Sequence, residues 1–74
     1  MDQEFKRLQD TLAANVLRLR KAKNLSQEQL AFEAGVDRTY VSQVERRVNN
    51  PSLLVLHKLA VALGSSVTEM LTAP

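Results

Sequence analysis

Four polar side chains within a short stretch have the types and spacing needed to read a nucleic-acid sequence. They are Arg38, Thr39, Ser42 and Gln43. On a helix, residues three and four positions apart share one face. The fork of Arg38 matches the two acceptors of guanine, Gln43 can pair with adenine, and Thr39 offers thymine a methyl group. The alternative interpretation is an ordinary solvated face, because most exposed helix faces are polar.

The basic residues are spread unevenly along a chain of 74 residues with a net charge of +2. The stretch RLRKAK at 18–23 carries four positive charges and no acid, and Glu45 is the only acid between Arg38 and Lys58. A local basic surface is typical of proteins that bind nucleic acids. Solvated helix faces explain the same charges equally well, so charge alone leaves both interpretations open.

The sequence has none of the residue groupings that catalysis and metal binding need. The chain has no cysteine and a single histidine, His57, which is expected at the surface beside Lys58. It has no glycine-rich phosphate loop and no pair of acids in an apolar setting. We therefore expect no enzyme activity, no metal site, no cofactor and no small-molecule ligand.

Helical spacing of apolar residues predicts an all-α bundle of five helices in a single domain, 1–74. The expected helices cover residues 3–23, 26–34, 37–46, 51–63 and 66–71. The first helix has a predicted buried stripe of Phe5, Leu8, Leu12, Val16 and Leu19. No signal peptide is visible and the apolar runs are too short to span a membrane, so we expect a soluble, cytoplasmic protein.

The second and third helices are separated by a turn of about three residues, which forces a steep crossing. Ser26 and Gln29 have the spacing of a capping box, and Gly35 suits the left-handed end of the second helix. Ala31 supplies the small residue that a close crossing needs, and Asp37 is the expected cap of the third helix. Two short helices held in this way would position the polar face described above.

The fourth helix is expected to begin at Asn50 as its cap, with Pro51 in its first position. Its predicted core face consists of Leu53, Leu56, Leu59, Ala60 and Leu63. Ser66 and Glu69 have the spacing of a second capping box at the start of the last helix.

The stretch LSQEQLAFEAGVDRTYVSQVERRVNNPSLLVLHKLAVALG resembles the lambda-repressor-like (Cro/cI, or XRE) helix-turn-helix domain, with the motif at about 26–46. The resemblance covers roughly residues 13–71. Its marks are Gln27, Ala31, Gly35, Val41, Val44, Glu45 and the fourth-helix sequence NPSLLVLHKLAVALG. The stretches DRTYVSQVER and NPSL also resemble the controller proteins of restriction–modification systems, a dimeric subgroup.

The resemblance implies a role for each matching position. Residues expected to contact bases are Arg38, Thr39, Ser42 and Gln43. Residues expected to contact phosphates are Gln27, Tyr40, Arg46, Asn49 and Asn50, and Gln27 would also brace the recognition helix. An ion pair between Arg20 and Glu45 would tie the first helix to the third.

Arg47 departs from the family pattern, which usually has glycine at this helix end. A non-glycine residue in a left-handed conformation costs on the order of 1 kcal/mol. We therefore expect the loop at 47–50 to be free to follow another path, with the added charge of Arg47 available to a phosphate. The long first helix, with Phe5 and Leu8, also extends beyond the family pattern.

Leu54, Val55 and Val61 form a candidate dimer interface on the fourth helix. Leu54 and Val61 lie seven residues apart and therefore share a face, which points away from the expected core. These features predict a homodimeric regulator that binds double-stranded DNA at a palindromic operator, such as a restriction–modification controller. The alternative is an antitoxin or phage-type repressor whose helical surface also binds a protein partner.

Overall fold

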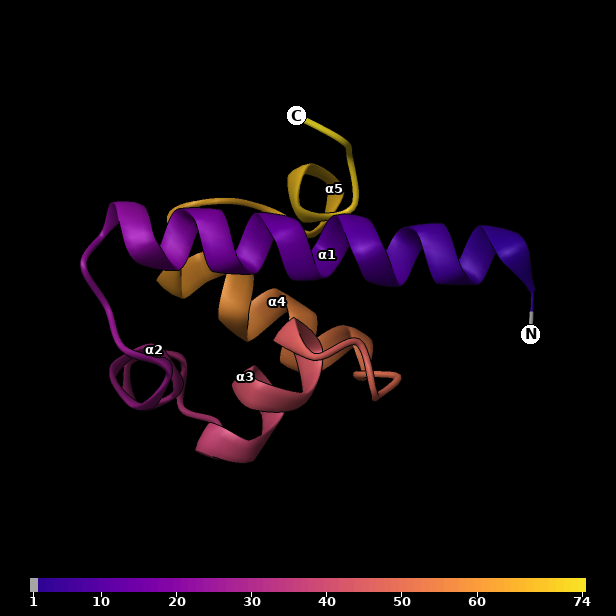
Figure 1. Ribbon diagram of the computed structural model, residues 1–74. Helices are drawn as coiled ribbons and strands as arrows, with labels where there is room; N and C mark the ends of the chain where they lie inside the picture. The colour runs from indigo at the N-terminus through magenta and orange to yellow at the C-terminus, as the bar shows by residue number, and fades with distance from the viewer. Residues whose placement is uncertain (1) are drawn as a thin grey trace.

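The computed structural model describes residues 2–74, which form five α-helices and no strand (Figure 1). The helices are α1 (Gln3–Ala22), α2 (Gln27–Ala34), α3 (Arg38–Glu45), α4 (Leu53–Ala62) and α5 (Val67–Met70). The all-α fold and the five predicted helices are therefore confirmed. None of these helices is long and apolar enough to cross a membrane.

Side chains next to the helix ends explain where most helices begin. The Ser26 hydroxyl accepts from the N–H of Gln29 at 3.0 Å, and the Gln29 side chain accepts from the N–H of Ser26 at 2.8 Å. This is the predicted capping box, and it satisfies two amides that α2 itself cannot pair. Asp37 caps α3 as predicted, accepting from the N–H of Thr39 at 2.8 Å.

The predicted start of α4 is wrong by two residues. Ser52 is the cap, because its hydroxyl accepts from the N–H of Val55 at 3.1 Å. Asn50 and Pro51 therefore precede the helix and belong to the loop. The shift leaves Leu53 largely exposed in the first turn of α4, in place of its predicted position in the core. At α5, the Ser66 hydroxyl caps the N–H of Glu69 at 3.1 Å.

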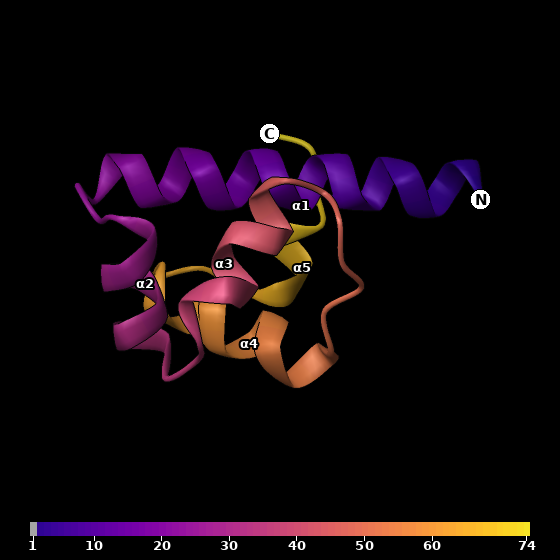
Figure 2. The same cartoon turned by 60° about the horizontal axis from the view of Figure 1, so that its bottom comes forward.

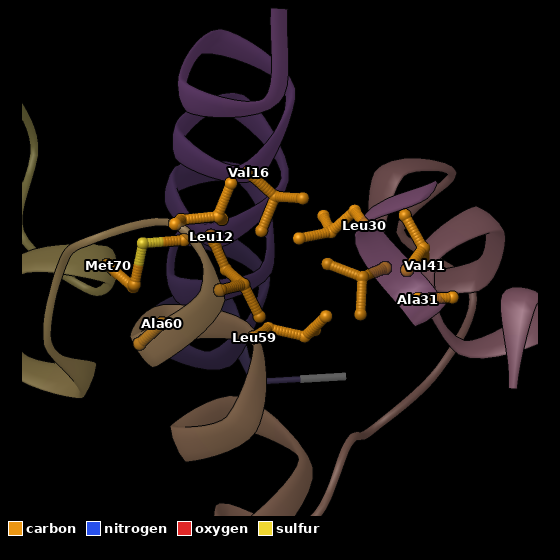
Figure 3. Close-up of a cluster of buried hydrophobic side chains, with 10 residues drawn as sticks. Leu12, Val16, Leu30, Ala31, Val41, Leu59, Ala60 and Met70 are labelled. Carbon is orange, nitrogen blue, oxygen red and sulfur yellow. The ribbon is translucent and has the colours of Figure 1, made fainter. Parts of the chain in front are cut away.

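One hydrophobic cluster joins all five helices (Figure 3). Its buried members are Leu12, Val16, Leu30, Ala31, Val41, Val44, Leu59, Ala60, Leu63 and Met70. The predicted stripe of α1 is only partly in this core: Leu12 and Val16 are buried, whereas Leu8 is 44% exposed. The reason is visible in Figures 1 and 2, where the N-terminal turns of α1 extend past the other helices.

Asn15 is the only buried polar side chain recorded within residues 2–74. Its amide nitrogen donates to the carbonyl of Met70 at 2.8 Å and to that of Thr72 at 3.1 Å. Its oxygen accepts from Arg18 at 3.0 Å. Since the last carbonyls of a helix lack partners within it, this one side chain fastens the end of α5 to the middle of α1.

Candidate nucleic-acid interface

The third helix buries one face and leaves the other open. Val41 and Val44 are in the core, so α3 is anchored through a spacing of three residues. Arg38 and Thr39 are exposed in its first turn, and Ser42 and Gln43 are half-buried one turn later. In Figure 2 most of α3 lies below α1, and only its C-terminal end passes in front of that helix. All four residues predicted to contact bases therefore retain exposed surface on this helix.

A close crossing of α2 and α3 sets the direction in which this surface faces. Gly35 ends α2 with a φ of 71°, and its N–H donates to the carbonyl of Phe32 at 3.2 Å. Ala31 is buried, and its carbonyl accepts from the N–H of Val36 at 3.0 Å. The small side chain and the left-handed turn together allow two eight-residue helices to pack directly against each other.

A single carboxylate links three helices behind the exposed face. Arg20 of α1 donates to both oxygens of Glu45, from Nε at 2.7 Å and from Nη2 at 3.0 Å. Gln27 of α2 donates to the same carboxylate at 3.0 Å. The side chains of Arg20 and Glu45 are only 13% and 9% exposed. Because α3 ends at Glu45, this group holds the helix against both α1 and α2.

The same contacts account for the protonation behaviour of Arg20. Its hydrogen bond to Glu45, supported by the charge of that carboxylate, raises the pKa of Arg20 above its ordinary value despite partial burial. Arg20 also donates from Nη1 to the carbonyl of Leu25 at 2.9 Å. The guanidinium is thus fixed in place on two sides, as a bidentate pair requires.

At the start of α3, Asp37 is a charged cap. Hydrogen bonds from Thr39 lower the pKa of Asp37 below its ordinary value, with a smaller contribution from the charge of Arg38. The carboxylate occupies the positive end of the helix dipole, and so stabilises the turn that carries Arg38 and Thr39. At the other end, Arg46 donates from Nε to the Ser42 hydroxyl at 3.3 Å.

The α3–α4 loop, residues 46–52, does not take the different path that we considered for it. Arg47 adopts the left-handed conformation, with a φ of 61°. Its N–H donates to the carbonyl of Val44, and the N–H of Val48 donates to that of Gln43, both at 3.1 Å. These bonds complete the end of α3. Arg47 therefore accepts the strain of a left-handed conformation, and the helix ends with the backbone that glycine usually provides.

Two residues of α1 hold this loop. Asp10 pairs with Arg47, with 3.0 Å between Oδ1 and Nε, and the two side chains are 48% and 45% exposed. Gln9 donates to the carbonyl of Asn49 at 2.8 Å. Asn49 is half-buried and Asn50 is exposed. Sequence reasoning did not single out Asn15, Gln9 or Asp10, because their partners lie far away along the chain.

The candidate dimer face is only partly exposed. Leu54 and Val61 are 60% and 62% exposed on α4. Val55 is half-buried and packs against the core, so less of its surface is available to a partner. Leu53, exposed one residue before Leu54, extends the apolar surface instead. Within residues 2–74 no group of three His, Asp or Glu side chains is placed to hold a metal ion.

Comparison with known proteins agrees with this geometry. The chain is 47% identical over 68 residues to the control protein C.SmaI of Serratia marcescens, covering 92% of this chain and 81% of that protein. Its structure is similar to the restriction–modification controller protein C.AhdI of Aeromonas hydrophila, with a TM-score of 0.76 and 47% identity. That match covers 81% of this chain and 91% of the other.

SinR of Bacillus subtilis, a master regulator of biofilm formation solved in complex with DNA, is also similar. The TM-score is 0.77 at 35% identity, covering 82% of this chain and 98% of that one. SinR has also been solved in a complex with the protein SinI. The helix-turn-helix family HTH_3 matches residues 16–70, which comprise the C-terminal part of α1 and all of α2, α3, α4 and α5. The chain therefore belongs to the HTH_3 helix-turn-helix family, the XRE (Cro/cI-like) group of DNA-binding transcriptional regulators.

Proposed function

We propose that this protein is a sequence-specific regulator that binds double-stranded DNA as a homodimer, with α3 of each protomer in a major groove. The observation that carries the proposal is the mounting of α3. Its apolar face is buried, its end is fixed by Arg20 and Gln27 through Glu45, and Arg38 and Thr39 remain exposed. A helix that reads bases needs a free polar face on a rigid support.

The proposed base contacts follow from the chemistry of the exposed side chains. Arg38 would donate to the two acceptors of guanine, and Gln43 would pair with adenine. The methyl group of Thr39 would contact a thymine methyl group, and the hydroxyl of Ser42 would donate to an acceptor on a base edge. These contacts would set the preferred sequence.

Phosphate contacts would fix the position of α3 in the groove without reading sequence. The proposed residues flank the helix on both sides: Gln27, Tyr40, Arg46, Arg47, Asn49 and Asn50. Gln27 would use its remaining donor, since its amide already bonds Glu45. Arg46 lies directly after α3 and is exposed, and so its charge is available to the backbone of the duplex.

The dimer would form through Leu54 and Val61 of α4, with Val55 at its edge. A symmetric pair presents two copies of α3, and so it would bind a roughly palindromic operator with half-sites one helical turn apart. Dimerisation would then couple DNA binding to protein concentration. Such a protein would act in the cytoplasm, where a bacterial operator is found, and we expect it to need neither a cofactor nor a small-molecule ligand.

The control-protein relatives favour a role as the controller of a restriction–modification system. A second candidate is a repressor that also binds a protein partner, which the complex of SinR with SinI supports. We do not expect catalysis in either case, since the relatives are named as regulators.

Selection of bound sequences from a pool of random duplexes tests the proposal. We expect a palindromic motif, and binding to it that weakens steeply as salt rises. Arg38→Lys serves as a control because it keeps the charge but loses the fork that recognises guanine. Failure to recover a motif, together with salt-independent binding, would contradict DNA reading and favour the protein-partner role.

A further inference from the structure

Arg47 and the N-terminal part of α1, which the sequence analysis placed outside the helix-turn-helix pattern, meet each other in the structure. Arg47 lies at a left-handed helix end, and Asp10 lies on the part of α1 that precedes the family match at residues 16–70. The two side chains form one of the two ion pairs found within residues 2–74. The other is the pair of Arg20 with Glu45, which is largely buried.

The position of Arg47 brings this ion pair next to the proposed DNA-binding surface. Arg47 follows Arg46 directly, and its N–H bonds the carbonyl of Val44 in the last turn of α3. Figure 2 shows the α3–α4 loop leaving α3 beside α1 and descending to the start of α4. The side chain of Arg47 therefore projects from the end of α3, the helix proposed to read bases.

The pair is exposed enough to be opened. Both side chains are nearly half exposed, and an exposed ion pair is weak and screened by salt. Asp10 contacts the guanidinium through a single oxygen, whereas a DNA phosphate offers it two acceptor oxygens for a bidentate pair. Asp10 and a phosphate would thus compete for one side chain, and a phosphate contact that uses the Nε of Arg47 must first release Asp10.

We propose that Asp10 restrains DNA affinity by competing with phosphate for Arg47. The inference rests on the proposed function. Asp10 lowers the binding contribution of Arg47 by the free energy of the ion pair. It also flattens the salt dependence, because salt that weakens the phosphate contact weakens the competing pair as well. Asp10 is thus a positioning residue that acts through Arg47.

The test compares Asp10→Asn with Glu4→Gln in binding to a mixed-sequence duplex between about 50 and 200 mM salt. Glu4 is an exposed acid of the same helix, so its variant changes net charge equally. We expect Asp10→Asn to bind more tightly, by up to about fivefold at low salt, with a steeper salt slope by up to about 1. Glu4→Gln should show neither change.

A double-variant cycle separates competition from a general effect of charge. In an Arg47→Gln background, Asp10→Asn should give no gain over the single variant. A gain that persists in that background overturns the inference, and so does binding weaker than that of the parent. Asp10→Ala provides a second variant, and thermal melting establishes that each variant is folded. If the parent itself shows no salt-dependent DNA binding, the proposed function fails. If the parent binds but Asp10→Asn behaves like Glu4→Gln, only the inference about Asp10 fails.

Discussion

The guanidinium of Arg20 donates to both oxygens of Glu45, at 2.7 Å and 3.0 Å, across the junction of α1 and α3. Gln27 shares the carboxylate from α2. The three side chains form a connection between helices that are separate in sequence, and we expect the stability of α3, the helix proposed to face DNA, to depend on it.

Removal of Glu45 should therefore be costly. Glu45→Ala leaves the Arg20 guanidinium largely buried without its partner, and we expect a loss of about 3 kcal/mol in the free energy of unfolding. Urea denaturation measures it. Asp10→Ala, which removes the acid of the exposed pair, should cost no more than about 1 kcal/mol. Equal midpoints for the Glu45→Ala variant and the parent would show that the buried pair contributes nothing.

Replacement of Asn15 should also destabilise the fold, for a different reason. Asn15→Ala removes the donor that satisfies the carbonyls of Met70 and Thr72, and we expect a loss of about 1–3 kcal/mol. Limited proteolysis should then cut the C-terminal residues before the rest of the chain. Ala14→Gly on the exposed face of α1 is a control for helix propensity alone. An Asn15→Ala variant no more susceptible to proteolysis than this control would contradict the role of the clamp.

Replacing Arg38, at the start of α3, and Arg46, directly after its end, should give different defects in DNA binding. Arg38→Ala should cost about 1–3 kcal/mol and remove the preference at one position of each half-site. Arg46→Ala should weaken binding to all duplexes alike and reduce the salt slope by about 1. Motif selection and titration against salt distinguish the two. An unchanged motif with Arg38→Ala would mean that α3 does not read bases.

The exposed surface of α4 predicts a change in oligomeric state. Replacing both Leu54 and Val61 by glutamate should give a folded monomer in analytical ultracentrifugation, with weaker operator binding. Phe32→Glu on α2 is the control, since Phe32 is even more exposed but lies outside this face. A dimer that survives the double change would move the interface to the apolar groove of about 120 Å³ beside Phe5 and Leu8.

The cap of α3 predicts a pH effect on stability. The folded-state pKa of Asp37 is lowered, so its stabilising contribution is complete above the ordinary value of 3.8 and is lost as pH falls through the lowered value. Asp37→Asn keeps a capping side chain but cannot titrate, so its stability should fall less across this acid range. Thermal melting of both proteins against pH measures the difference, and parallel curves would exclude a contribution from Asp37.

Local signals made the helix-turn-helix predictable. Ser26, Gly35 and Asp37 act on their immediate neighbours, and so their roles follow from sequence spacing. The start of α4 was harder, because Asn50 and Ser52 are both good caps and only the path of the loop decides between them. The choice of Ser52 depends on contacts that the local sequence does not contain.

Long-range contacts account for the other differences. Leu8 fits the apolar spacing of α1, but the other helices lie toward the C-terminal part of α1, and so the residue stays 44% exposed. Asn15 falls between apolar neighbours, and only the arrival of α5 gives its amide a partner. The left-handed conformation of Arg47 is likewise accompanied by an ion pair to Asp10, which no helical periodicity reveals.

The shared carboxylate of Glu45 also has a consequence for local motion. A helix of eight residues is too short to be stable alone, and at a loosely held site it would open by itself. Here α3 cannot detach without breaking bonds to both α1 and α2, so its amide hydrogens should exchange with solvent only in openings that disrupt much of the domain. The helix therefore meets its ligand already ordered, and little conformational entropy is lost when it binds.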